Sequence, residues 1–355
     1  MAIRLGIIGC GEVVAQGHAP ALREASDITV VGLADPSPDR TGIVAAALGA
    51  DVPGFADYRQ LLAQCELDAV LLATPSRLRE EIIADLAAAG VFIVCEKPLA
   101  LTLAGADAIL AACQAAGVGL AVCHSWAYFA EYLTMRQLIR DGAVGTLHTV
   151  SFSGLSANPW AGAATWHPGW RDDPAIAGGG RFLDSGLHSL YLMEMMFGEQ
   201  AESVSAEVQF DPDVAVEARC FSRFSFPAGV GLVNVGRGQG PAHASATGTD
   251  GRIQIVHPVE AGDLGAQPER VVVVRDGRVT ESVPVPPRVM CTPAFYAAVT
   301  RAVRGEPAAP LTGTAGRRAV ELVMGAYAAG ARGEPVRFPL APDDPVYQRG
   351  ADALW

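Results

Sequence analysis

Short apolar runs alternate with amphipathic stretches from Ile3 to Cys123, and this alternation limits the possible folds more than any other feature of the chain. Runs this apolar are typical of strands buried on both faces, as in parallel sheets covered by helices. The pattern predicts a doubly wound α/β domain, a dinucleotide-binding Rossmann domain, over residues 1–123. The expected strands are Ile3–Ile8, Thr29–Ala34, Ala69–Ala73, Phe92–Cys95 and Gly119–Cys123. The expected helices are Val13–Ala25, Asp39–Leu48, Tyr58–Gln64, Arg79–Ala89 and Leu103–Ala116.

The pattern changes after Cys123. Strand-like segments separated by glycine turns such as Asp250-Gly251 indicate antiparallel hairpins. We therefore expect an α+β domain with an open, mainly antiparallel sheet over residues 124–355, with closing helices free to pack back on the first domain. The expected helices are Tyr132–Arg140, Gly186–Met196, Pro293–Arg304 and Gly313–Ala331, with a loop from Asn158 to Gly180. The expected strands are Leu147–Ser153, Ser203–Gln209, Ala218–Phe226, Val230–Gly236, Ala244–Gly248, Arg252–Val256, Arg270–Arg275 and Val279–Val283.

A glycine turn joins the first predicted strand to the first predicted helix and reads Gly9-Cys10-Gly11-Glu12-Val13-Val14. In a dinucleotide site the first glycine permits a tight turn, and the second lets the backbone approach a pyrophosphate. The third glycine of this fingerprint is absent, and Val14 stands in its place. The motif predicts a cofactor site that includes Glu12 and Val13. A glycine turn of an α/β domain without a cofactor is the alternative.

Asp35 ends the second predicted strand, 24 residues after Gly11. An acidic side chain there accepts hydrogen bonds from the adenosine ribose hydroxyls and repels a 2′-phosphate, so it favours NAD over NADP. Arg40 lies nearby and could pair with such a phosphate, which keeps NADP as the alternative. Asp35 could also only cap a turn with Pro36.

Two later strand ends border the expected ligand crevice. Thr74-Pro75 follows one strand, and its proline either fixes a turn against the cofactor or simply starts the next helix. Glu96-Lys97-Pro98 follows another, and Pro98 restricts Lys97 to extended conformations. An ammonium group there could stabilise a developing alkoxide and lower the pKa of a neighbouring imidazole. A solvated lysine paired to Glu96 is the alternative.

Asp184 and His188 are four residues apart after the run Gly178–Gly180. If a helix begins at or just after Asp184, both side chains face the same direction, and the carboxylate can orient the imidazole. His188 could then accept the hydroxyl proton of an alcohol or return it in reduction. The glycine run suggests a backbone held close to a ligand. Asp184 as a helix cap and His188 as a core histidine are the alternatives.

The order of these motifs closely resembles one family over nearly the full chain: the glucose–fructose oxidoreductase, inositol dehydrogenase and rhizopine-catabolism (Gfo/Idh/MocA) family of NAD(P)-dependent oxidoreductases. Its most specific elements are Glu96-Lys97-Pro98 and Asp184-x-x-x-His188. The resemblance implies that Lys97, Asp184 and His188 form the catalytic trio. It also implies that Trp170-Arg171 closes over the nicotinamide end of the cofactor.

Three departures from the family pattern concern Val14, Arg79 and Ala127. Arg79 stands where the family often has a histidine, and Ala127 lies near where many members have an arginine. These two departures bear on the substrate side of the site. His124, Tyr128, Trp166 and His167 are expected either to shape an unusual pocket or only to pack.

Composition narrows the class of partner. The net charge of −12 argues against nucleic acid or an anionic membrane surface as the main partner. The apolar stretches are short and the N-terminus lacks a signal-peptide pattern, so a cytoplasmic location is expected. The seven cysteines include no CxxC pair and no zinc-type spacing, so reduced buried thiols and no metal site are expected.

The sequence thus predicts an NAD-preferring oxidoreductase that acts on a secondary alcohol or ketone of a sugar, amino sugar or cyclitol. The alternative is a dinucleotide-binding sensor or partner subunit without turnover. The run Val271-Val272-Val273-Val274 is apolar toward both faces of the second sheet, which predicts an exposed apolar patch unless something covers it. Since the family's members are commonly oligomers built through this sheet, a homodimer or homotetramer is expected.

Overall fold

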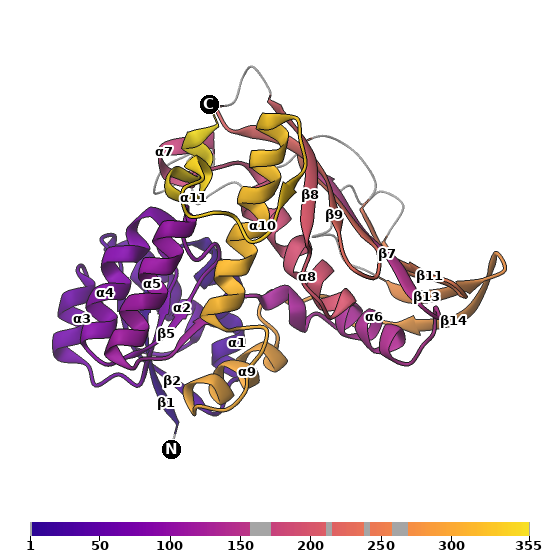
Figure 1. The fold of residues 1–355 in the computed structure, drawn as a ribbon. Helices are drawn as coiled ribbons and strands as arrows, with labels where there is room; N and C mark the ends of the chain where they lie inside the picture. Colours follow the sequence, from indigo (N-terminus) through magenta and orange to yellow (C-terminus); the bar gives the residue numbers. More distant parts are fainter. Residues whose placement is uncertain (1, 157–171, 211–214, 238–241, 258–268, 355) are drawn as a thin grey trace. The chain divides into compact units, whose positions relative to one another are not determined.

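The computed structural model describes residues 2–156, 172–210, 215–237, 242–257 and 269–354, which form two compact units (Figure 1). The first unit contains residues 2–125 and Val289–Arg318. The second contains the described residues of 126–288 and those from Ala319 onward. No helix in the described ranges combines the length and apolar character needed to cross a membrane.

A six-stranded parallel sheet forms the centre of the first unit, in the order β3-β2-β1-β4-β5-β6. The expected strands are all present, with ends shifted by at most one residue, and the side chains of Ile3–Ile8, Ala69–Leu72 and Phe92–Cys95 are almost all buried. The two-residue β3 was not predicted, because it is too short to show a pattern. The strands are β1 (Ile3–Ile8), β2 (Ile28–Ala34), β3 (Gly54–Phe55), β4 (Ala69–Leu72), β5 (Phe92–Cys95) and β6 (Leu120–Val122).

The strand order reverses between β1 and β4, and ligands of open α/β sheets bind at such a switch point. The segments that leave both strands are joined there. The Gly9 N–H donates to the Ala34 carbonyl at 2.8 Å, and the Ala73 N–H donates to the Ile8 carbonyl at 2.8 Å. The glycine turn and the Thr74 segment therefore lie at the same edge of the sheet.

The helices of the first unit follow the predicted pattern with one difference. The segment predicted as a single helix, Val13–Ala25, begins as a π-helical segment, Val13–His18, and continues as α1. Pro20 lacks a backbone N–H, so the regular α-helical hydrogen bonding changes here. The helices are α1 (Ala19–Glu24), α2 (Pro38–Leu48), α3 (Tyr58–Gln64), α4 (Arg79–Ala88), α5 (Leu103–Ala116) and α9 (Pro293–Val303), and α10 (Gly313–Arg332) begins in this unit.

The second unit is built on a nine-stranded sheet, in the order β14-β13-β12-β11-β7-β10-β9-β8-β15. Its pairs are antiparallel except β7 with β10, which confirms an open, mainly antiparallel sheet. The strands are β7 (Leu147–Ser156), β8 (Ser203–Phe210), β9 (Glu217–Ser225), β10 (Val230–Arg237), β11 (His243–Gly248), β12 (Gly251–Val256), β13 (Arg270–Arg275), β14 (Arg278–Pro284) and β15 (Val336–Arg337).

Helices cover one face of this sheet. α8 (Leu187–Phe197) packs on β7 and β10, and α6 (Ala130–Arg140) packs on β12 and β13. Alternate residues such as Phe152, Val233 and Val235 point into this core and are buried. Two short helices, α7 (Pro174–Ala177) and α11 (Pro345–Arg349), were not predicted, because four or five residues carry no helical periodicity.

The other face of the sheet is more polar than the sequence predicts. Leu232 lies between Ser151 of β7 and Arg223 of β9, and it is 40% exposed. Val271, Val272 and Val273 are all buried within the chain, so the expected patch from this run is not present.

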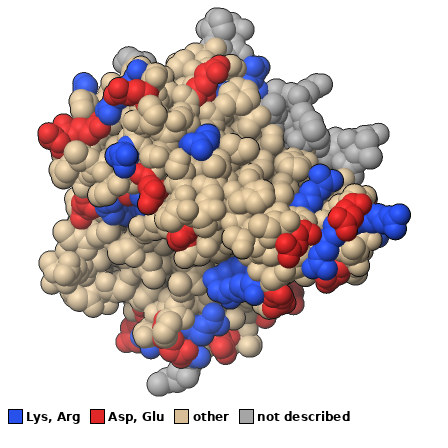
Figure 2. Space-filling view, turned by 45° about the vertical axis from the view of Figure 1, so that its right-hand side comes forward, with Lys and Arg blue, Asp and Glu red and all other residues tan. Residues whose placement is uncertain are grey.

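Figure 2 shows acidic and basic side chains interspersed on the face in view, without a large patch of one sign.

Candidate active site

The glycine turn after β1 has the geometry of a dinucleotide loop. Gly9 has φ +88°, and a Cβ atom there would lie 2.8 Å from the Ala73 backbone, so only glycine fits. At Gly11, in contrast, a Cβ atom would meet nothing within 4 Å. Gly11 is therefore not required by packing within the chain, and its bare backbone leaves room for a ligand.

Asp35 and Arg40 hold this turn in place. The Asp35 carboxylate accepts hydrogen bonds from the Cys10 N–H at 2.8 Å and from the Ser37 N–H at 2.9 Å. The buried Arg40 donates through Nε to the Cys10 carbonyl at 2.8 Å and pairs with Glu12 at 3.3 Å. Asp35 thus caps a turn, which was the alternative to a ribose contact in the sequence analysis. It also fixes the glycine loop from the end of β2.

The Thr74 segment supplies a second observation that fits a ligand. The Thr74 hydroxyl is buried, and no hydrogen-bond partner for it is found in the described parts of the chain. Buried polar groups without partners are rare and require an explanation. The open Gly11 backbone and this hydroxyl border one edge of the sheet, so the residues present fit a bound dinucleotide. Pro75 precedes a short 3-10 turn, Ser76–Leu78, before α4.

Lys97 stands just beyond β5 and is the only lysine among the 355 residues, the other 25 basic residues being arginine. Arginine is always charged and presents a wide planar fork, whereas lysine offers a compact ammonium that can exchange a proton. Lys97 is half-buried, and its backbone N–H donates to the Glu96 carboxylate at 3.0 Å. A chain that otherwise uses arginine keeps one lysine at the expected ligand crevice.

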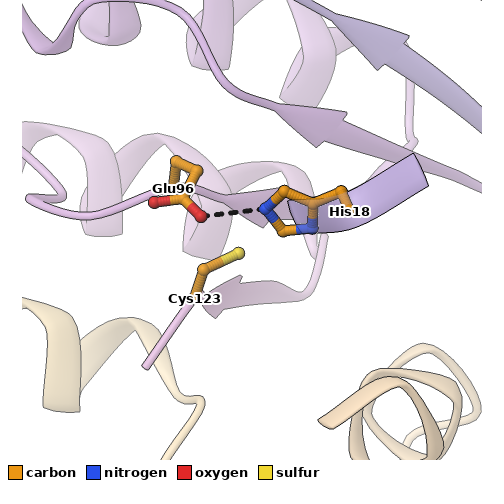
Figure 3. A group of neighbouring side chains, drawn as sticks. All are labelled: His18, Glu96 and Cys123. Atoms are coloured by element: carbon orange, nitrogen blue, oxygen red, sulfur yellow. Dashed lines mark hydrogen bonds and ion pairs between the residues drawn. The ribbon is translucent and has the colours of Figure 1, made fainter. Parts of the chain in front are cut away.

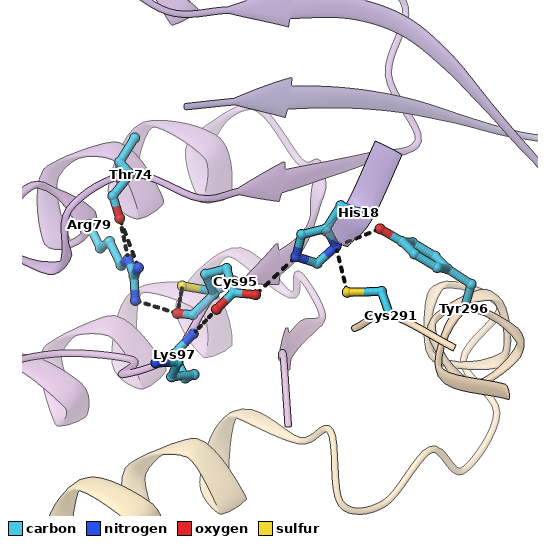
Figure 4. A network of polar contacts seen from close by, with 8 residues as sticks. His18, Thr74, Arg79, Cys95, Lys97, Cys291 and Tyr296 are labelled. Carbon is cyan, nitrogen blue, oxygen red and sulfur yellow. Dashed lines mark hydrogen bonds and ion pairs between the residues drawn. The ribbon is translucent and has the colours of Figure 1, made fainter. Parts of the chain in front are cut away.

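A buried arginine fixes the backbone around Lys97. Arg79 donates to the carbonyl oxygens of Thr74 and Glu96 (Figure 4). It also donates to the carbonyl oxygen of Pro98. Arg79 therefore joins the ends of β4 and β5. The sequence analysis noted Arg79 only as a departure from the family pattern that bears on the substrate side, and it did not predict this positioning contact.

A buried ion pair behind Lys97 was missed by the sequence analysis. The His18 Nε2 atom contacts the Glu96 carboxylate at 2.9 Å, and Nδ1 contacts the Tyr296 hydroxyl at 2.7 Å and the Cys291 sulfur at 3.5 Å (Figure 4). Burial alone lowers the pKa of His18, but the Cys291 sulfur and the Glu96 carboxylate reverse this effect and raise it to about 10. Burial raises the pKa of Glu96, but the His18 hydrogen bond reverses this and holds it below the ordinary value.

His18, Glu96 and Cys123 also place three metal-ligand atoms within 4.8 Å of one another (Figure 3). Two of these atoms are already joined in the His18–Glu96 ion pair. Burial raises the pKa of the Cys123 thiol well above its ordinary value, which disfavours the thiolate that a metal requires. The arrangement is therefore that of a hydrogen-bonded ion pair beside a neutral thiol.

The glycine run before Asp184 packs against the protein itself, whereas the sequence suggested that its backbone lies close to a ligand. Gly178 ends α7 with φ +70°, and a Cβ atom at Gly180 would overlap the Glu217 carbonyl oxygen. The Glu217 carboxylate accepts hydrogen bonds from the Gly180 N–H and from the Phe182 N–H, the latter at 2.9 Å. The buried Glu217 of β9 therefore anchors the start of the segment that carries Asp184 and His188.

Asp184 lies inside a π-helical segment, Phe182–Gly186, that runs into α8. It does not cap α8, whose N-cap is Gly186. The buried His188 contacts the Tyr191 hydroxyl through Nδ1 at 2.7 Å, and its ring stacks on Trp126 with centroids 4.3 Å apart. The imidazole is therefore held on two sides within the second unit.

The remaining predicted site residues have different outcomes. His124 is fully buried after β6, and burial lowers its pKa to about 4, which indicates a neutral ring. Tyr128 is half-buried in a 3-10 turn, Ser125–Tyr128. Trp166, His167, Trp170 and Arg171 lie outside the described residues. All seven cysteines are free, and six are buried.

Comparison with known proteins identifies the family. The family model described as "Oxidoreductase family, NAD-binding Rossmann fold" matches residues 3–124. The GFO/IDH/MocA C-terminal domain matches residues 132–254. The chain belongs to the GFO/IDH/MocA oxidoreductase family. The resemblance noted in the sequence is thereby confirmed, and the first unit is an NAD-binding Rossmann domain.

Similar curated proteins include a rhizopine catabolism protein, a D-apiose dehydrogenase and an inositol 2-dehydrogenase. The rhizopine catabolism protein MocA of Rhizobium meliloti is 30% identical over 70% of this chain and 76% of its own length. The D-apiose dehydrogenase of Paraburkholderia graminis is 29% identical over 59% of this chain. The match covers 54% of that dehydrogenase and 61% of an inositol 2-dehydrogenase of Rhizobium meliloti, so both are matched over less than two thirds of their length.

Solved structures show the same fold. The aldose-aldose oxidoreductase from Caulobacter crescentus, complexed with glycerol, has a TM-score of 0.82 at 21% identity, over 95% of this chain and 100% of the other. The WlbA dehydrogenase from Bordetella pertussis, in complex with NADH and UDP-GlcNAcA, has a TM-score of 0.76 at 23% identity, over 96% and 100%.

The buried ion pair yields a stability prediction. His18→Gln leaves the buried Glu96 carboxylate without its cation, and breaking such a pair costs about 3–5 kcal/mol. Because the folded pKa of His18, about 10, exceeds its ordinary value of 6.5, its contribution is complete below pH 6.5 and is lost as the pH rises toward 10. Urea unfolding should therefore show a larger difference between wild type and variant at pH 6 than at pH 9.5.

The exposed His148 offers a matched control, and His148→Gln should leave stability unchanged at both pH values. A His18→Gln deficit that is equal at pH 6 and pH 9.5, or smaller at pH 6, would show that folding does not raise the pKa of His18.

Proposed function

We propose that this chain is an NAD-dependent dehydrogenase or ketoreductase that acts on a secondary alcohol or ketone of a sugar, amino sugar or cyclitol. The observation that carries the proposal is the single lysine of the chain, fixed just beyond β5 of an NAD-binding Rossmann domain. The names of the relatives, which include apiose and inositol dehydrogenases, support this substrate class. A polyol suits such a site, because polar side chains can read several hydroxyls while one carbon faces the cofactor.

The proposed mechanism assigns roles to residues of the two motifs, Glu96-Lys97-Pro98 and Asp184-x-x-x-His188. The glycine turn, Asp35 and Thr74 would hold NAD, which would supply the hydride chemistry. His188 takes the hydroxyl proton as hydride leaves the substrate carbon, or returns it in reduction. The Lys97 ammonium stabilises negative charge on the substrate oxygen. Asp184 would favour the protonated form of His188 through its carboxylate, and Glu96 and Thr74 would border the bound cofactor.

Substitutions at Lys97 and His188 test the chemistry. Lys97→Ala and His188→Ala should each lower kcat by about 10²–10⁴, the usual range for a positioned proton-transfer group. Lys97→Arg should also lower kcat, since a guanidinium keeps the positive charge of the ammonium but not its compact shape. Turnover is followed by nicotinamide absorbance with a panel of polyols and their ketones, and His148→Ala serves as the control.

Full kcat in His188→Ala would remove His188 from the mechanism. Tight NAD binding with no turnover on any member of the panel would favour the sensor or partner-subunit alternative.

Cofactor preference tests the assignment of Asp35. Asp35→Ser should weaken NAD binding and relatively favour NADP, because the charge facing a 2′-phosphate is lost. Gly11→Ala should weaken both dinucleotides alike, since its new methyl group meets no protein atom within 4 Å and can clash only with a ligand. Calorimetry measures both affinities, with Asp39→Ser and Gly42→Ala as exposed controls on α2. A wild-type preference for NADP of tenfold, about 1.4 kcal/mol, would refute the assignment.

We further propose a closed homodimer or homotetramer formed through the open face of the second-unit sheet. The half-exposed Leu232 and the neighbouring Arg223 fit an interface of mixed character, in which arginine is enriched. Light scattering at micromolar concentration should give at least twice the 36.9 kDa chain mass. Leu232→Asp should shift the equilibrium toward monomer, whereas Val279→Asp, at a more exposed position of β14, should not. A wild type that is monomeric throughout would contradict this assembly.

A further inference from the structure

The His188 ring contacts Tyr191 and Trp126, and neither residue has a role in the mechanism above. The Tyr191 hydroxyl lies 2.7 Å from His188 Nδ1, and it also accepts a hydrogen bond from the Trp126 backbone N–H at 3.2 Å. The Trp126 ring lies parallel to the imidazole, with an interplanar angle of 5°. The three residues belong to the second unit, so this arrangement does not depend on the first.

In the hydrogen bond between Tyr191 and His188, either group can be the donor, depending on the tautomer of His188. If the hydroxyl donates to Nδ1, the neutral imidazole carries its proton on Nε2, and Nε2 then cannot act as a base. If Nδ1–H donates to the hydroxyl oxygen, the neutral ring keeps its lone pair on Nε2. Only the second direction persists when the ring gains a proton, because both nitrogens of an imidazolium are donors. A phenolic oxygen has two lone pairs, so it can accept from Trp126 and from His188 together.

We propose that Tyr191 is a positioning residue that holds His188 in the Nδ1–H tautomer, so that Nε2 is the atom that exchanges a proton with substrate. The proton exchange with substrate rests on the proposed dehydrogenase function, whereas the tautomer of His188 does not depend on that function. Trp126 completes the support, because its ring fixes the plane of the imidazole and its π-face stabilises the imidazolium formed when the proton arrives.

The Trp126 ring is itself held by its neighbours. It stacks against Phe129 with centroids 5.9 Å apart, and the Arg288 guanidinium lies 5.7 Å from its centroid. Arg288 forms an ion pair with the buried Glu131 of α6. The ring that sets the imidazole plane is therefore packed against aromatic and charged groups of the same unit, and it has little freedom to tilt.

The direct test is the tautomer of His188, read from nitrogen NMR shifts of protein labelled with ¹⁵N-histidine, in which each imidazole nitrogen reports whether it carries a proton. A His188→Gln variant assigns the signal among the seven histidines. In wild type, His188 should be protonated on Nδ1 when neutral. Tyr191→Phe keeps the aromatic ring and removes only the hydroxyl, so it should give a mixture of tautomers and lower kcat about tenfold to a hundredfold with little change in KM.

Tyr58→Phe is a matched control, because it removes a hydroxyl that bonds Asp85 at 2.7 Å in the first unit, and it should leave the His188 signals unchanged. A wild-type His188 protonated on Nε2 would overturn the proposal, as would an unchanged tautomer in Tyr191→Phe. The wild-type spectrum needs no variant and no turnover. If no substrate is found, the proposed function fails, yet the tautomer still decides the role of Tyr191.

Discussion

The backbone at the end of β5 is the constraint on which the rest of the site depends. Arg79 donates to carbonyl oxygens on both sides of Lys97. The ion pair with His18 fixes the side chain of Glu96, the residue before Lys97. A buried guanidinium and a buried carboxylate are costly to desolvate, so such groups persist where their contacts satisfy them. Here these contacts tie the ends of two parallel strands together and fix the one lysine at the edge where the cofactor loop also lies.

The second unit follows the same physical logic with different residues. Glu217 accepts two backbone N–H groups at the start of the helical segment, and Tyr191 and Trp126 hold the imidazole a few residues later. In each unit a group proposed to react is half-buried or buried and is supported by side chains that do not react. This support reduces the reorganisation that the reaction requires, because the donors and acceptors are already oriented.

The fold of this chain could be predicted from its sequence because burial on both faces makes the parallel strands continuous apolar runs, and glycine turns separate the antiparallel ones. The side chains that hold the site residues in place could not be predicted. His18, Arg79 and Glu217 are polar residues whose partners lie far away in sequence, and neither spacing nor periodicity reports such contacts. The glycine run misled for a related reason: at Gly180 the close neighbour is the Glu217 backbone, which the sequence does not place there. The one local signal that was overlooked is that Lys97 is the only lysine.

That single lysine also permits the most direct measurement. Reductive methylation with ¹³C-formaldehyde labels only the Lys97 amine and the N-terminal amine, so the NMR spectrum resolves both. If Lys97 borders the bound cofactor, saturating NAD should shift the Lys97 methyl signal and leave the N-terminal signal in place. A Lys97 signal that stays unmoved while calorimetry shows NAD bound would contradict the placement of this residue at the reaction centre.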